Sequence, residues 1–160
     1  MVNSKSWKWF GLALLVVVLD QLSKYWVTWA FEYGETVAVT GFFNLTLVHN
    51  TGAAFSFLSD AGGWQRWFFA AVAMTVSVVL IIWIARVANG QRWVAAALAL
   101  ILGGALGNLW DRMALGYVVD FLDVYYQTYH WPAFNVADSA ITIGAVLLLL
   151  ENFFPKKPAR

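Results

Sequence analysis

The sequence has 160 residues, of which 61% are hydrophobic and only 12% are charged. Soluble domains carry about 45–50% apolar and about 25% charged residues, so this composition indicates an integral membrane protein. A net charge of +1 without a basic run argues against nucleic-acid binding. The chain has no cysteine, which excludes disulfides, thiolate nucleophiles and Cys-ligated metal or iron–sulfur sites. Because the only two histidines, His49 and His130, are far apart in the sequence, we expect no metal and no cofactor.

Four apolar stretches predict four membrane-spanning helices in one domain over residues 1–160. The helices are expected at approximately residues 10–28, 67–85, 93–110 and 133–152. The second and third carry no charge over a length sufficient to cross a bilayer. The first and fourth contain Asp20, Lys24 and Asp138, which must therefore lie near a membrane surface or face the protein interior. Tryptophans flank the spans, as in the aromatic belts of membrane proteins.

The distribution of charge predicts the orientation. Seven of the ten lysines and arginines fall on one side of a four-span model, and eight of the nine acids fall on the other. Since positive residues favour the cytoplasmic side, both termini are expected inside the cell. The long segments 30–66 and 111–132 are then outside.

The outer segment 30–66 contains a predicted hairpin. Residues Thr36–Val39 and Phe43–Val48 alternate with period two, are rich in β-branched and aromatic residues, and are separated by Gly41. Asn50-Thr51-Gly52 indicates a turn. The predicted fold class is therefore an all-α membrane protein with a small outer β-hairpin and an outer segment 111–132 rich in Tyr and Trp.

Several polar residues are spaced to share a helix face near the outer surface. Asp20 and Lys24 are four apart and can pair; an ion pair that only anchors the first helix is the alternative. Gly104, Asn108 and Arg112 are also spaced by four. The simple alternative for Gly104 is close helix packing. The simple alternative for Arg112 is a side chain that extends toward the membrane surface. An amide within the membrane needs a partner, so Asn108 indicates more than packing.

Carboxylates and an amide supply the candidate chemistry. Asn135 and Asp138 lie at the start of the fourth helix, where a helix cap is the simple explanation. Asp120 follows two valines, and Asp123 lies three residues further on and is expected to face water. If Asp120 and Asp138 meet in a low-dielectric site, they cannot both ionise cheaply and would share a proton. One could then act as base on water and the other as acid toward a carbonyl oxygen. Periodicity alone leaves open whether they meet.

Five motifs in order resemble the bacterial lipoprotein signal peptidases, also called type II signal peptidases. They are Asp20-Gln21-Leu22-Ser23-Lys24, Asn50-Thr51-Gly52-Ala53-Ala54-Phe55-Ser56, Gly103-Gly104-Ala105-Leu106-Gly107-Asn108-Leu109-Trp110-Asp111-Arg112, Val118-Val119-Asp120-Phe121 and Phe134-Asn135-Val136-Ala137-Asp138-Ser139. Each motif alone is weak evidence, whereas their order, spacing and the four-span layout together are specific. The resemblance covers essentially the whole chain.

The resemblance implies an aspartic endopeptidase of the bacterial cytoplasmic (inner) membrane, with its active site near the periplasmic face. Its partners would be membrane lipids and prolipoproteins that carry diacylglycerol on a cysteine, and it would cut just before that cysteine. We expect it to be a monomer without metal. Asp120 and Asp138 match the family's catalytic pair. Supporting or substrate-binding positions are matched by Asp20, Lys24, Asn50, Gly104, Asn108, Arg112 and Asn135. The outer hairpin would be a cradle, and the segment 111–132 a mobile flap.

Two other classes of protein stay open on the residues alone. A small proton-coupled transporter would use membrane acids such as Asp20 and Asp138 as a proton relay, but it favours mid-helix acids and inverted repeats. An assembly factor would use the same polar residues only to hold helices together. Activity on a lipid-modified substrate separates both from a peptidase.

Overall fold

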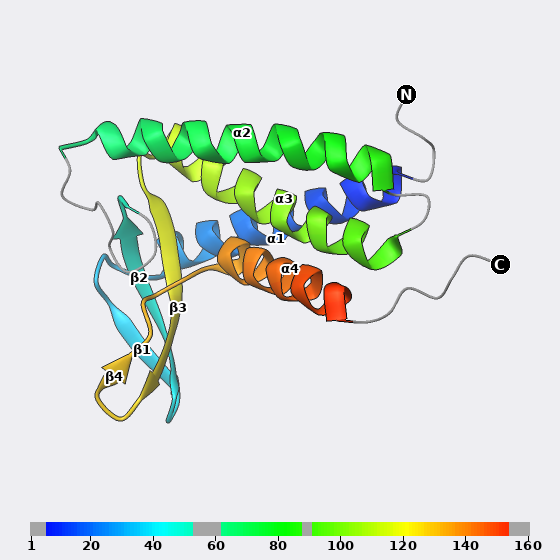
Figure 1. The fold of residues 1–160 in the computed structure, drawn as a ribbon. Helices are drawn as coiled ribbons and strands as arrows, with labels where there is room; N and C mark the ends of the chain where they lie inside the picture. Colours follow the sequence, from blue (N-terminus) through cyan, green and yellow to red (C-terminus); the bar gives the residue numbers. More distant parts are fainter. Residues whose placement is uncertain (1–5, 53–61, 88–90, 154–160) are drawn as a thin grey trace.

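The computed structural model describes residues 6–52, 62–87 and 91–153. Four long helices lie side by side, and a small sheet lies across one end of them (Figure 1). In chain order the elements are α1 (Trp7–Ala30), β1 (Thr36–Thr40), β2 (Phe43–Asn50), α2 (Trp64–Val87), α3 (Arg92–Ala114), β3 (Val118–Tyr126), β4 (Tyr129–His130) and α4 (Val136–Phe153). The start of α1 and the end of α4 lie at the end of the bundle away from the sheet (Figure 1).

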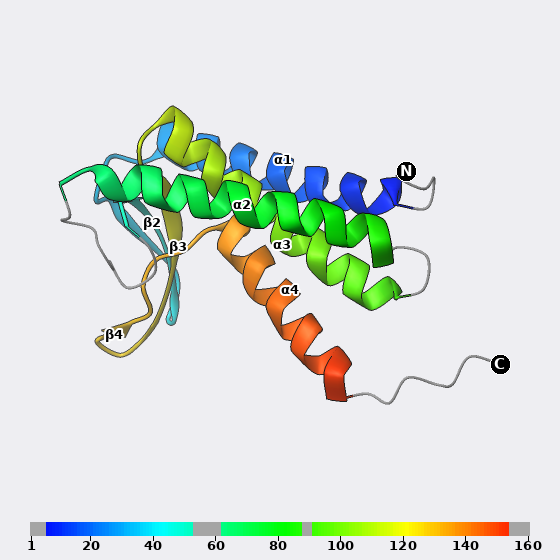
Figure 2. The same cartoon turned by 45° about the horizontal axis from the view of Figure 1, so that its top comes forward.

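Three of the predicted membrane spans are confirmed by length and composition. Helices α1, α2 and α3 are each long and apolar enough to cross a bilayer, and each extends beyond the predicted bounds by a few residues at one or both ends. Helix α4 has 18 residues and coincides with the fourth predicted stretch. That α4 also crosses the membrane stays a prediction. Figure 2 shows α4 running obliquely away from α2 toward its C-terminal end.

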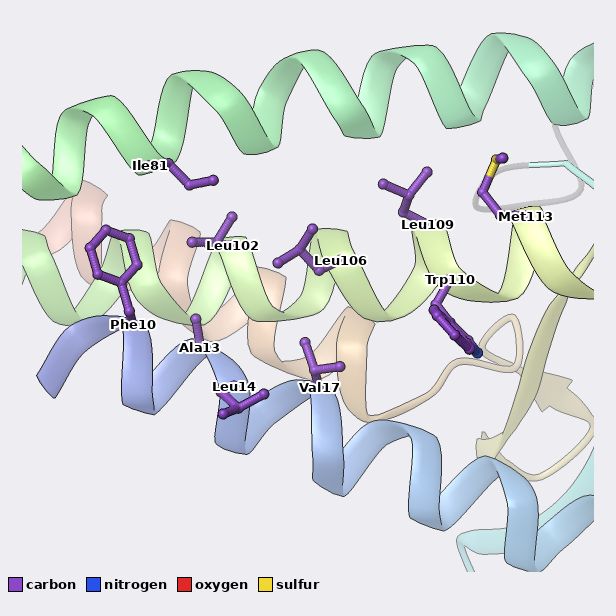
Figure 3. A pocket seen from close by; sticks show the side chains of 10 residues that line it. All are labelled: Phe10, Ala13, Leu14, Val17, Ile81, Leu102, Leu106, Leu109, Trp110 and Met113. Carbon is purple, nitrogen blue, oxygen red and sulfur yellow. The ribbon is translucent and has the colours of Figure 1, made fainter. Parts of the chain in front are cut away.

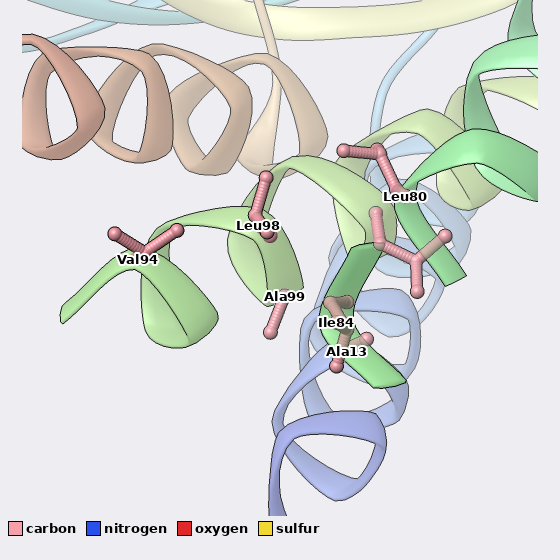
Figure 4. Packing of buried hydrophobic residues seen from close by; sticks show 7 residues of the cluster. Ala13, Leu80, Ile84, Val94, Leu98 and Ala99 are labelled. Carbon is pink, nitrogen blue, oxygen red and sulfur yellow. The ribbon is translucent and has the colours of Figure 1, made fainter. Parts of the chain in front are cut away.

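Helix α3 is the centre of the bundle because it packs against the other three helices. Its apolar window is 61% buried, against 28% for α1 and 22% for α2, so most of the surface of α1 and α2 is left to face lipid. Ala13 of α1, Ile84 of α2 and Ala99 of α3 belong to one buried cluster (Figure 4). Small side chains at such positions let helices approach closely where lipid is as apolar as the core.

The predicted hairpin is confirmed, but the fold is not all-α. Strands β1 and β2 pair antiparallel, with Thr36 opposite Thr46. Strand β3 then pairs with β2, and β4 with β3, to give a four-stranded antiparallel sheet in the order β1-β2-β3-β4. Burial alternates over the first residues of β2, whereas the first four residues of β3 are all buried, so the first part of β3 is covered on both faces.

The segment 111–132 is therefore not a separate flap. Its first residues complete α3 to Ala114, and the following residues form β3 and β4. Pairing of β3 with β2 joins residues about 70 positions apart, such as Val48 and Asp120, which no local pattern reports. Residues 53–61 of the other outer segment, including the Ala53–Ser56 part of the second motif, lie outside the described residues.

Candidate active site

Two carboxylates reach the same place from two different elements. Asp120 is the third residue of β3 and follows two buried valines. Asp138 lies in the first turn of α4, where its Oδ2 accepts the backbone N–H of Asn135 at 3.3 Å. The Asn135 side-chain oxygen in turn accepts the backbone N–H of Asp138 at 2.9 Å. This reciprocal pair is a capping box, which fixes how the helix begins.

Asn135 connects the two acids. Its side-chain amide donates to Asp120 Oδ1 at 2.7 Å, while its backbone N–H donates to Asp138. Asn50 donates to Asp120 Oδ2 at 2.9 Å, and Asn108 donates to Asp138 Oδ1 at 2.7 Å. Each of the four carboxylate oxygens therefore accepts one N–H. The structure brings together Asn50, Asn108, Asp120, Asn135 and Asp138, from four different parts of the chain.

The environment of Asp120 favours its protonated form. The side chain is buried, and desolvation together with the negative charge of Asp138 raises the pKa of Asp120 to about 7. The amides of Asn50 and Asn135 act in the opposite direction because they stabilise the ionised form. Near neutral pH Asp120 therefore readily holds a proton beside a second carboxylate, which is the condition for acid–base work by a pair.

A buried ion network on α1 and α3 supports the two carboxylates, Asp120 and Asp138. Lys24 Nζ lies 2.8 Å from Asp20 Oδ2 and 2.9 Å from Asp111 Oδ2, and it donates to Asn108 Oδ1 at 2.9 Å. Asp20 and Lys24 therefore pair as their spacing predicts, but the pair is deep inside the protein and is part of a larger set. Buried charges need such multiple partners, because desolvation is costly. Lys24 also fixes the orientation of the amide that donates to Asp138.

The same network holds the backbone of the site. Asp20 Oδ1 accepts the N–H of Ala137, at the start of α4. Asp111 Oδ2 accepts the N–H of Val119, the residue before Asp120. Two acids of the network thus fix the two backbone segments that carry the catalytic candidates.

Glycines allow α3 to approach its neighbours at this level. A Cβ at Gly107 would lie 2.6 Å from Asp20 Oδ2, and a Cβ at Gly104 would overlap the backbone of Ala137 on α4. Gly103 likewise meets Val16 of α1. The helix-packing role of these residues is thus confirmed, and for Gly104 and Gly107 it directly sets the distance between α3 and the site.

Arg112 faces the protein, as predicted. It donates to the carbonyl oxygen of Gly52 at 2.9 Å and to that of Asn108 at 3.3 Å. Its guanidinium lies 5.4 Å from the centre of the Phe69 ring on α2. Arg112 thereby links the turn after β2 to the outer end of α3, beside the two carboxylates.

A cavity of about 900 Å³ opens onto the carboxylates. Its polar end is lined by Asn50, Asn108, Arg112, Asp120 and Asp138. Its apolar part runs along the helices and is lined by Phe69, Val72, Val76, Ile101, Ala105 and Ile141. An apolar substrate can therefore lie between α2, α3 and α4 with a polar bond presented to the acids.

Two residues of the network were not predicted as site residues. Asp111 is buried and binds both Lys24 and β3, and Gln21 donates to Asp111 Oδ1 at 2.8 Å and to Gly107 O at 3.2 Å. The spacing of Asp111, three residues after Asn108 and directly before Arg112, was the available signal. The prediction that Asp123 faces water is wrong. Asp123 is buried against Asn44 and His130, because Asn44 of β2 is its partner in the sheet.

Among the described residues there is no group of three His, Cys, Asp or Glu side chains arranged to hold a metal ion. The fold and the buried carboxylates that open onto an apolar cavity are those of a membrane-embedded enzyme. A family model described as signal peptidase (SPase) II matches residues 12–154. The chain belongs to this family, and the resemblance seen in the sequence is confirmed.

Relatives and solved structures agree with this assignment. A lipoprotein signal peptidase of Cellvibrio japonicus is 58% identical over 95% of this chain and 89% of its own length. One of Cupriavidus necator is 59% identical over 90% of this chain and 82% of its own length. A bacterial membrane enzyme solved by the in meso method at 2.3 Å is 33% identical. Its TM-score is 0.83, and the match covers 96% of this chain and 93% of that one.

Proposed function

We propose that this protein is an aspartic endopeptidase that removes signal peptides from diacylglyceryl-modified prolipoproteins by cutting just before the lipidated cysteine. Removal of signal peptides from prolipoproteins follows from the family and from relatives described as lipoprotein signal peptidases. The aspartic mechanism rests on one observation: a single residue, Asn135, donates hydrogen bonds to both Asp120 and Asp138. The transporter alternative is not favoured, because the family and these relatives are peptidases.

In the proposed mechanism the pair holds one proton. The ionised carboxylate takes a proton from a water molecule, whose oxygen attacks the carbonyl carbon of the scissile peptide bond. The protonated carboxyl group donates to the carbonyl oxygen, which gives a neutral tetrahedral diol. When the C–N bond breaks, the protonated carboxyl group gives its proton to the leaving nitrogen, and one hydroxyl of the diol gives its proton to the other carboxylate, so the pair again holds one proton. Lys24 supplies positive charge near the acids and favours the ionised form of Asp120.

The roles of the other residues follow from their contacts. Asn50, Asn108 and Asn135 orient the carboxylates, and Asp20 with Lys24 holds α1 and α4 in register. Gly104 permits the close approach of α4. Arg112 fixes the turn at Gly52, beside the cavity. The apolar part of the cavity would hold the apolar parts of the substrate.

We further propose that both termini are cytoplasmic and that the sheet and active site lie at the periplasmic face of the inner membrane. The start of α1 and the end of α4 lie at one end of the bundle and the sheet at the other (Figure 1). Reporter fusions after Glu35 and Tyr125 should give the outer compartment, and a fusion at Gly90 the cytoplasm. The inverted pattern would contradict this orientation.

The function is tested with purified protein in detergent and two forms of one prolipoprotein, with and without diacylglycerol on the cysteine. Cleavage of the lipidated form before the cysteine, unaffected by EDTA, is expected. Failure to cleave either form would contradict the proposed function. Loss of activity in EDTA would contradict the aspartic mechanism.

A further inference from the structure

Three polar side chains form a row across the sheet on the face opposite Asp120. Asn44 of β2 donates to Asp123 Oδ2 at 2.8 Å, and His130 Nδ1 of β4 lies 2.9 Å from both oxygens of Asp123. Asp120 and Asp123 are three residues apart on β3, so the alternation of a strand places them on opposite faces. The row therefore lies outside the catalytic cavity.

Strand β4 is attached to β3 by main-chain pairing and by this row. It has only two residues, and it pairs with β3 through Tyr125 with His130 and Tyr126 with Tyr129. The ring of His130 also stacks on Tyr125 at 5.1 Å. Asp123 is only 7% exposed, and a buried carboxylate is costly unless it is paired. The contact between Asp123 and the half-exposed His130 side chain therefore adds to the main-chain pairing that attaches β4 to β3.

The residues that follow β4 line the catalytic cavity. Trp131, Pro132 and Ala133, called here the lip, all belong to its wall. Trp131 continues the pairing through its N–H to Val124 O at 2.8 Å, and its side chain is 60% exposed. The position of the lip is therefore set at its N-terminal side by β4.

Phe134 closes the lip with an attachment of its own. Its N–H donates to Leu122 O at 3.0 Å, and its carbonyl oxygen accepts the N–H groups of Phe121 and Leu122. Asn135, which holds the two catalytic candidates, comes directly after this attachment. A change at β4 can thus move the lip while Phe134 keeps Asn135 in place.

We propose that Asn44, Asp123 and His130 form a latch that positions the lip over the cavity and so sets the affinity for the prolipoprotein. Asp123 and His130 are positioning residues in this scheme. The inference rests on the proposed function, because it concerns substrate binding at the same site. Loss of the latch should raise KM and leave kcat nearly unchanged, since the attachment at Phe134 is independent of it.

The test measures KM and kcat of full-length His130→Ala on the lipidated prolipoprotein. Loss of this half-exposed contact is expected to raise KM about threefold to fivefold, with kcat within about twofold of the parent. Asp123→Asn should act in the same direction. Glu35→Gln is the matched control, because this exposed carboxylate accepts the N–H of Glu32 and does not belong to the row. The KM of this variant should be that of the parent.

A disulfide provides the rescue, because the chain has no cysteine of its own. Tyr126 and Tyr129 are cross-strand partners, and such pairs lie within the Cα separation of a disulfide. Tyr126→Cys with Tyr129→Cys in the His130→Ala background should restore the parent KM when oxidised and lose it on reduction. An unchanged KM in His130→Ala would overturn the latch, as would a loss of kcat that the disulfide does not restore. If the parent itself cleaves nothing, the proposed function fails, and the latch with it.

Discussion

Among the described residues two grooves flank α3, and one of them ends at the two carboxylates of the proposed active site. The groove between α1 and α2 has a volume of about 660 Å³ and is lined by carbon-rich side chains along its whole length, among them Phe10, Leu14 and Leu106 (Figure 3). The catalytic cavity, between α2 and α4, has about 900 Å³ and ends at Asp120 and Asp138. Both are of the size of ligand-binding sites, so volume and apolar character do not distinguish them.

The difference comes from two stripes on α3 that are offset by one residue. Leu102, Leu106, Leu109 and Met113 line the carbon-rich groove. Ile101, Ala105, Asn108 and Arg112 line the catalytic cavity. One residue is a rotation of about 100° on a helix, so each stripe faces a different neighbour. The sheet and the start of α4 then bring Asp120 and Asp138 to the second stripe only.

The largest expected effect is the loss of turnover when either of the two acids, Asp120 or Asp138, is replaced. Asp120→Asn and Asp138→Asn should each lower turnover by at least about 10³-fold, because an amide can neither accept nor deliver the proton. The double variant should be about as inactive as either single one, since the pair acts as a unit. Protein level and membrane insertion should change little. A single variant that retains turnover would show that the two grooves do not differ in the way proposed.

A second prediction concerns the approach of α4 to α3. Gly104→Ala places a Cβ against the backbone of Ala137, so α4 must shift and carry Asp138 with it. We expect turnover to fall about 10²-fold and stability to fall by about 1–3 kcal/mol, measured by tryptophan fluorescence during thermal unfolding. Gly11→Ala on α1 is the control. Nothing lies within 4 Å of its added Cβ, so it should retain turnover and gain about 0.5–1 kcal/mol. Equal effects of the two changes would contradict the packing role.

The third prediction compares the effects of filling each groove from the same helix, α2. Val76 and Ile81 lie on α2, are 40% and 41% exposed, and line the catalytic cavity and the carbon-rich groove respectively. Val76→Trp should lower kcat/KM about tenfold or more, because it fills the cavity that takes the substrate. Ile81→Trp should leave kcat/KM within about twofold. If filling the carbon-rich groove were equally harmful, that groove would also serve the substrate.

Much of the helical frame could be predicted because its signals are local. Apolar runs identified α1, α2 and α3, and four-residue spacing identified the pairing of Asp20 with Lys24 and the face shared by Asn108 and Arg112. Local patterns do not report contacts between distant segments of the chain, and this explains the errors. Asp123 meets Asn44 across 79 positions of sequence, so nothing near Asp123 indicates that it is buried. Taken alone, the aromatic segment that forms β3 does not indicate that it pairs with β2 of the distant hairpin.

The meeting of the two acids is the clearest case of non-local information. Asp120 lies on a strand and Asp138 on a helix, and each has a local explanation of its own. The residue that joins them is Asn135, through its side-chain amide and its backbone N–H. Its position follows from a capping box, which is local, and from the pairing of Phe134 with Leu122, which is not. The candidate site residues could be named from motifs, whereas their hydrogen bonds, the buried Asp111 and the role of Gln21 required the fold.

The smallest expected effect is a shift in the pH at which kcat declines on the alkaline side. Burial and the charge of Asp138 raise the pKa of Asp120 to about 7. Because the mechanism needs one proton on the pair, kcat should decline as the pH rises through about 7 and that proton is lost. The hydrogen bond from Asn50 favours the ionised form of Asp120 and so lowers this pKa.

Asn50→Ala removes that hydrogen bond, so the proton should be held to higher pH. The alkaline limb of the kcat profile should therefore move upward, even if the maximal rate falls because Asp120 is less well oriented. Thr75→Ala on α2 is the control, since its hydroxyl only donates to Ala71 O, and its profile should overlay that of the parent. A limb that moves downward, or that does not move while kcat falls, would mean that the Asn50 amide positions Asp120 without tuning its proton. The raised pKa of Asp120 would then depend on desolvation and on the charge of Asp138.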